Sequence, residues 1–148
     1  MAQIVAGFGV PHTPVFPFFV KRDGPDCETA KLFAAVARAL ASWPATLRVV
    51  IMGSGSFSLE VAGPRMAPGR TDGVPDPDWA LRVIKYLEEQ QIEKLIGEAT
   101  SHQLLKAGNV GGELLNWIAM LGAIGDRKPN YVAPQMQNGH AYGVWRWN

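Results

Sequence analysis

The side chains best suited to metal binding or proton transfer in this chain are its three histidines. His12 follows an apolar run on a proline-rich loop, just past the end of a predicted strand, where α/β sheets place ligand-binding residues. A loop histidine that only bonds to the backbone fits the same pattern. His102 opens a predicted helix and is interpreted as a solvated or capping residue. His140 lies beside an Asn138-Gly139 turn and is interpreted as structural, which leaves His12 as the leading candidate.

A glycine-rich segment and one carboxylate are the other candidates. Gly53-Ser54-Gly55-Ser56 is similar to a phosphate-binding loop, but neither the G-x-x-x-x-G-K-S/T nor the G-x-G-x-x-G spacing is present. Its serines also lack the G-x-S-x-G pattern of a hydrolase nucleophile, so the glycines are better explained by a tight turn at a strand end. Glu113 begins a predicted helix, where the helix dipole favours a carboxylate, and both a capping and a functional role fit it.

These residues must be positioned by an α/β fold, which the order of the apolar segments predicts. Apolar runs at 3–10 and 47–52 are typical of buried strands, and an amphipathic helix between them completes a strand–helix–strand unit. The stretch 130–147 predicts a hairpin with its turn at Asn138-Gly139. We therefore expect a compact single domain over residues 1–148, with a small mixed β-sheet flanked by helices.

Four helices are expected between these strands. Asp76-Pro77-Asp78 is a helix start, with a capping acid and a proline at the first helical position. Apolar residues within 92–96 have helical spacing, and Ser101 is expected to cap a further helix that Gly108 ends. The apolar positions of 113–121 recur at i, i+3, i+4 and i+7, and they predict the strongest helix, with a glycine directly after it.

Two loops complete the predicted organisation. Prolines at 11, 14 and 17 forbid a regular helix across the aromatic stretch 15–20. That loop either folds over the core or forms the wall of a pocket for an apolar ligand. The stretch 62–74 contains three glycines and two prolines without periodicity, and it is expected to be a loop.

Composition excludes several classes of protein. The 148 residues carry a formal net charge of +1, from 14 basic and 13 acidic side chains, so no basic excess indicates a nucleic-acid partner. Hydrophobic residues at 47% and charged residues at 18% exclude an intrinsically disordered chain. No apolar stretch approaches the ~20 residues that cross a membrane. Cys27 is the single cysteine and cannot form an internal disulfide, which favours a reducing, cytoplasmic location.

Three segments occur in an order that is typical of one enzyme family. They are IVAGFGVPHTP at 4–14, GSGSFSLEVAGPR at 53–65 and GGELLNWIAMLGA at 111–123. Together they resemble the class III extradiol ring-cleavage dioxygenases of the protocatechuate 4,5-dioxygenase β-subunit type. The segments are similar to the family's His-x-Pro loop, its glycine-rich segment and its carboxylate-bearing helix. Family members are longer, and an internal deletion near 39–43 would account for the difference.

The resemblance implies a non-haem Fe(II) site. The family holds iron by two histidines and one carboxylate, which leaves positions open for a catecholate and O₂. His12 and Glu113 correspond to two of these ligands. The second iron histidine belongs to the missing region. Either His140, or else His102 or a residue of a neighbouring subunit, replaces it, or ordinary ring cleavage is lost.

The resemblance also assigns the surroundings of the metal. Leu59 stands at the position of the family's acid–base histidine, and a leucine cannot transfer a proton. Ser56 and Phe57, with Phe16 in the aromatic loop, would line the substrate site.

Three functional interpretations follow. The first is an extradiol dioxygenase-like protein that acts on or binds a small catechol-type compound, with an incomplete iron site. The second is a non-catalytic binding or assembly subunit, and the third is an internally deleted fragment of a longer dioxygenase. Because a shortened sheet would expose an edge or an apolar face, we expect a homo-oligomer.

Overall fold

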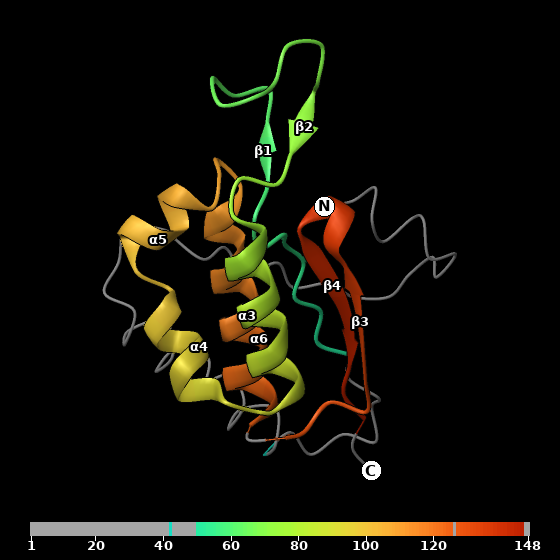
Figure 1. Cartoon of the computed structure of the whole chain (residues 1–148). Coiled ribbons are helices and arrows are strands. Elements are labelled where there is room, and N and C mark those ends of the chain that lie inside the picture. Colours follow the sequence, from blue (N-terminus) through green and yellow to red (C-terminus); the bar gives the residue numbers. More distant parts are fainter. Residues whose placement is uncertain (1–41, 43–49, 126, 147–148) are drawn as a thin grey trace.

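The computed structural model describes residues 42, 50–125 and 127–146, and Figure 1 shows how their elements are arranged. The helices are, in chain order, α3 (Pro77–Glu88), α4 (Ile92–Glu98), α5 (Ser101–Lys106) and α6 (Leu114–Ile124). Helices α4 and α5 lie to one side of α3 and α6, and the C-terminal β-hairpin lies on the other side (Figure 1). The predicted α/β class is confirmed.

The strands form two small antiparallel sheets. Strands β3 (Tyr131–Gln135) and β4 (His140–Val144) make the predicted C-terminal hairpin. Its connection is longer than a two-residue turn, because a 3-10 turn over Met136–Asn138 precedes Gly139, whose φ is 61°. The second sheet pairs β1 (Glu60–Val61) with β2 (Asp72–Gly73), so the expected 62–74 loop carries a strand near its end.

The single mixed sheet that the sequence predicted is not found among the described residues. The predicted strand at 3–10 lies outside them, and of the strand at 47–52 only residues 50–52 are described, in no strand. The segment that follows bonds to side chains of α6 instead of to another strand. Asn116 Nδ2 donates to the Ser54 carbonyl oxygen at 2.7 Å, and Trp117 Nε1 donates to the Gly55 carbonyl oxygen at 2.8 Å.

Helix α3 begins where the sequence predicted. The Asp76 carboxylate accepts a hydrogen bond from the Trp79 N–H at 3.1 Å, which satisfies one of the free N–H groups of the first turn. The cap of α5 was predicted one residue too late, because Thr100 and not Ser101 accepts the hydrogen bond from the Gln103 N–H. Both caps are local contacts of residues three positions apart.

Helix α6 is longer than predicted. A 3-10 turn, η1 (Gly111–Glu113), precedes it, and the helix runs through Gly122 to Ile124, with Gly125, at φ 76°, as its C-cap. Nine of its eleven residues are buried, so tertiary packing outweighs the ~1 kcal/mol that a glycine costs inside a helix.

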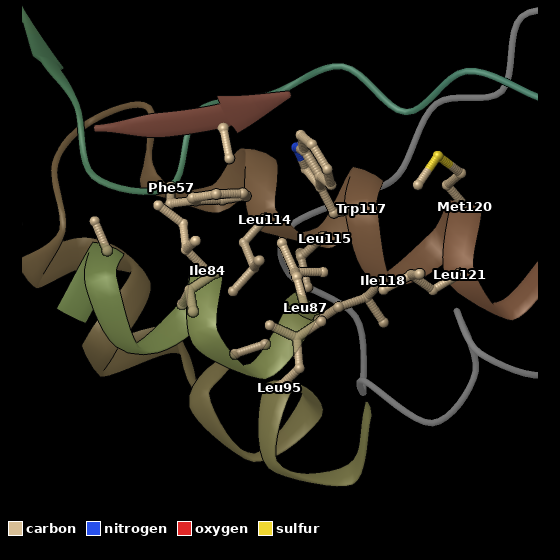
Figure 2. Packing of buried hydrophobic residues seen from close by; sticks show 14 of the residues in the cluster. Phe57, Ile84, Leu87, Leu95, Leu114, Leu115, Trp117, Ile118, Met120 and Leu121 are labelled. Carbon is tan, nitrogen blue, oxygen red and sulfur yellow. The ribbon is translucent and has the colours of Figure 1, made fainter. Parts of the chain in front are cut away.

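The hydrophobic core joins α3, α4, α6, the hairpin and Phe57 (Figure 2). Phe57 and Leu114 are fully buried. The ring of Phe57 meets that of Trp117 edge-on, with 5.1 Å between centroids. Among the described residues, no helix is long and apolar enough to cross a membrane.

Candidate functional site

The glycine-rich segment 53–56 lies along η1 and the first turns of α6, so two of the three motif segments meet in the structure. Gly55 permits this approach, because a β-carbon at that position would lie 2.5 Å from the Glu113 β-carbon and 2.6 Å from the Glu113 carbonyl oxygen. Gly55, predicted to allow a tight turn, therefore serves a close packing contact with the predicted carboxylate ligand.

Glu113 ends η1 and directly precedes α6. Its Oε2 atom accepts a hydrogen bond from the Ser56 N–H at 2.8 Å, across 57 positions of sequence. Glu113 is the N-cap residue of α6, as the capping interpretation expected, but its side chain makes no capping hydrogen bond to the helix. Within the described residues, Oε1 of the half-buried side chain has no hydrogen-bond partner. Among the described residues, one carboxylate oxygen is thus held in place and the other has no partner.

Ser56 and Phe57 have different surroundings. Ser56 is half-buried and uses its N–H for Glu113, whereas the side chain of Phe57 has no exposed surface and packs in the core. The N–H groups of Phe57 and Ser58 both donate to the Gly139 carbonyl oxygen, at 2.9 and 3.0 Å. Phe57 therefore ties the segment to the hairpin and the core, and its contact with a ligand stays a prediction.

Leu59 is half-buried beside the loop that joins α5 to η1. Its carbonyl oxygen accepts a hydrogen bond from the Val110 N–H at 3.1 Å. The neighbouring Ser58 hydroxyl donates to the Ala107 carbonyl oxygen at 3.1 Å. The expected acid–base position therefore lies on a well-held segment, but its side chain has no group that exchanges a proton.

Glu60 is a buried carboxylate that the sequence reasoning did not assign to the site. Only 2% of it is exposed, and its Oε2 atom accepts hydrogen bonds from Arg65 Nη2 at 2.6 Å and from the Asn109 N–H at 2.8 Å. The Arg65 hydrogen bond, aided by the Asn109 N–H, outweighs burial and holds the pKa of Glu60 below its ordinary value. Glu60 is consequently a structural anion and no substitute for the missing base.

A second buried carboxylate, Asp76, joins α3 to α5. Besides capping α3, it accepts a hydrogen bond from Gln103 Nε2 at 3.1 Å and pairs with Lys106 Nζ at 2.7 Å. Burial alone would raise the pKa of Asp76, but the hydrogen bonds from Lys106, Gln103 and Trp79 outweigh it, and the pKa is lowered. This network stabilises the helices and does not contact Glu113.

The described histidines do not form a cluster with Glu113. His102 is exposed in α5. His140 is half-buried at the start of β4, where its Nδ1 lies 3.3 Å from the Asn138 carbonyl oxygen and its ring meets Tyr142 edge-on. His12 and Phe16 lie outside the described residues.

Fe(II) in such enzymes needs imidazole and carboxylate ligands gathered at one site. Among the described residues, no three His, Cys, Asp or Glu side chains are close enough together to hold a metal. The Glu113 carboxylate is a suitable ligand for Fe(II) but not a sufficient one. The described part of the chain therefore does not make an iron site by itself.

The sequence did contain a signal for Glu60. Gly63-Pro64-Arg65 follows it, and a turn brings an acid and an arginine five positions apart into contact. A β-carbon at Gly63 would collide with the Glu60 carboxylate, which explains the glycine of this motif. No sequence signal marked Asn109, whose side chain bonds to both the N–H and the carbonyl oxygen of Val61.

Comparison with known proteins adds one result. A family model described as the catalytic LigB subunit of aromatic ring-opening dioxygenase matches residues 3–145. That match includes all three motif segments and nearly the whole chain. Searches of curated proteins and of solved structures gave no match.

Proposed function

The chain belongs to the family of catalytic LigB subunits of aromatic ring-opening dioxygenases, and we propose that it binds a small catechol-type compound at an Fe(II) site that includes Glu113. The observation that carries this proposal is the 2.8 Å hydrogen bond from the Ser56 N–H to Glu113. It joins the glycine-rich segment to the carboxylate at the start of α6, whose Oε1 has no hydrogen-bond partner within the described part of the chain.

In this proposal Glu113 and His12 hold the metal, with His140 as a third candidate ligand. Bound Fe(II) would supply open coordination positions for a catecholate and O₂. Two protein ligands hold a divalent ion less tightly than three, so binding is expected to be weak and to depend on each of them. Ser56 would contact the ligand and Phe16 would cover it. Phe57 would support this side of the ligand site from within the core.

The alternative is a non-catalytic binding or assembly subunit, or an internally deleted fragment of a longer dioxygenase. The specific observation in its favour is the chemistry of positions 59 and 60. Leu59 has no proton to transfer, and the Glu60 carboxylate is occupied by Arg65 and Asn109. Binding of a catechol or of a second subunit without bound metal would fit this alternative.

Anaerobic Fe(II) titration of the full chain tests the proposal, followed by addition of catechol and then O₂. Glu113→Ala and His12→Ala are each expected to lower Fe(II) affinity at least about tenfold, because each removes one of two ligands. Glu88→Gln is the matched control, since Glu88 is an exposed glutamate on α3. Equal iron content in the parent and in both ligand variants would refute the proposed site.

A further inference from the structure

Two short segments, 56–60 and 109–113, are joined at both ends by the same kind of bond. At one end the Ser56 N–H donates to Glu113 Oε2, and at the other the Asn109 N–H donates to Glu60 Oε2, each at 2.8 Å. We call these two carboxylate–amide bonds the reciprocal clamp. Each segment thus supplies one carboxylate and one N–H group, four residues apart.

Contacts between the two ends keep the segments in one register. The Val110 N–H donates to the Leu59 carbonyl oxygen at 3.1 Å. Gly108, at φ 125°, packs so closely on that carbonyl that a β-carbon would collide with it. These contacts lie between the Glu60 end and the Ser56 end and connect the two.

Arg65 holds the Glu60 end of the clamp. Its Nη2 atom bonds to Glu60, and its Nη1 atom donates to the carbonyl oxygen of Lys106, the last residue of α5, at 3.0 Å. The guanidinium group therefore links a buried carboxylate to a helix end, a geometry that a fork of N–H donors provides and a lysine ammonium does not.

From these contacts we infer that Glu60, held by Arg65, is a positioning residue for Glu113. It sets the register in which the Ser56 N–H meets the Glu113 carboxylate, and so decides which carboxylate oxygen stays available. The inference rests on the proposed function only in taking Glu113 as the ligand-binding group.

Amide hydrogen exchange of the full chain, followed by NMR, tests this coupling. In Glu60→Gln the Asn109 amide loses a charged acceptor, and exchange of the distant Ser56 amide is also expected to accelerate about tenfold. Arg65→Ala, at a side chain that is 45% exposed, is expected to act in the same direction, and Arg65→Lys to restore part of the protection. The Arg65 variants keep the test valid if the buried Glu60 variant does not fold.

Two controls distinguish a positioning role of Glu60 from a general loss of stability. Arg70→Ala, an exposed arginine on the same loop, should leave the Ser56 amide unchanged. The Val83 amide within α3 should keep its protection in every variant. Faster amide exchange at Asn109 with unchanged exchange at Ser56 would overturn the inference. Equally faster exchange at Ser56 and Val83 would also overturn it.

Fe(II) affinity measured on the same variants gives a separate readout. If the parent binds iron, Glu60→Gln and Arg65→Ala should weaken binding, with Arg65→Lys intermediate. Unchanged affinity in all three would overturn the positioning role. If the parent binds no iron, but exchange of the Ser56 amide is still faster in Glu60→Gln, the reciprocal clamp is supported and the proposed function fails.

Discussion

Leu59 is the residue at which we expect this chain to differ most directly from the family's chemistry. It occupies the position expected for a proton-transferring histidine, on a segment whose backbone is held on one side by Val110 and on the other by the buried Glu60. The backbone at this position is therefore held in place, and the leucine side chain has no group that transfers a proton.

We expect at most feeble ring cleavage of catechol, protocatechuate or gallate by the chain alone. Leu59→His should not restore it, because a second iron histidine would still be missing. Oxygen consumption, normalised to bound iron, measures ring cleavage by the parent and by Leu59→His. Rapid turnover by the unmodified protein in proportion to its iron would contradict this and would point to His140 as the completing ligand.

Asp76 is expected to contribute stability that depends on pH. Asp76→Asn should lower the free energy of unfolding by about 2 kcal/mol at pH 7, because it removes a charged helix cap and the partner of Lys106. The folded-state pKa lies below the ordinary 3.8, so the contribution is full above that value and is lost as the pH falls through the lower, folded-state pKa.

Urea unfolding at pH 7 and at pH 2 measures this difference. Asp78→Asn is the control, since Asp78 is an exposed acid in the same first turn of α3. The two variants should differ clearly at pH 7 and converge at pH 2. A deficit of Asp76→Asn that is equally large at pH 2 would show that its charge is not responsible.

At the scale of elements, the contact between the glycine-rich segment and η1 decides whether the candidate site exists. Gly55→Ala should destabilise the protein by about 1–3 kcal/mol, because the new β-carbon overlaps Glu113 and forces the backbone to move. The Ser56 amide should lose protection at the same time.

Gly97→Ala is the matched control for this contact. Gly97 lies in α4, and nothing comes within 4 Å of a β-carbon built on it. Alanine there should be neutral or stabilise the helix by up to about 1 kcal/mol. Equal unfolding free energies for the two variants would argue against close packing of the segment on η1.

At the scale of the whole molecule, apolar side chains gather on the outer face of the β3–β4 hairpin. Tyr131 is 59% exposed and Tyr142 60%, and Val144, which is opposite Tyr131 in the register, is 42% exposed. Residues two apart on a strand share a face, so these side chains lie on one side of the sheet. Such a surface favours self-association.

We therefore expect at least a dimer at micromolar concentration, which native mass spectrometry measures. Tyr142→Ser should shift the population toward monomer, whereas Leu81→Ser, at a 49% exposed leucine on α3, should not. A parent protein that is monomeric under these conditions would contradict the prediction.

Much of the local structure followed from the sequence because its causes are local. The cap and proline at the start of α3, the spacing within α4 and the glycine after the 3-10 turn of the hairpin act over three or four residues. The order of three motifs predicted the family, which the match over residues 3–145 confirms.

Tertiary contacts decided the remainder. The Ser56–Glu113 and Glu60–Asn109 bonds join residues 57 and 49 positions apart, and no local pattern encodes which backbone N–H a distant carboxylate will meet. Burial also decided the end of α6, since packing on all sides carried the helix through Gly122. The residue types at the candidate site were therefore determined by the sequence, whereas the partner of each carboxylate was determined by long-range packing.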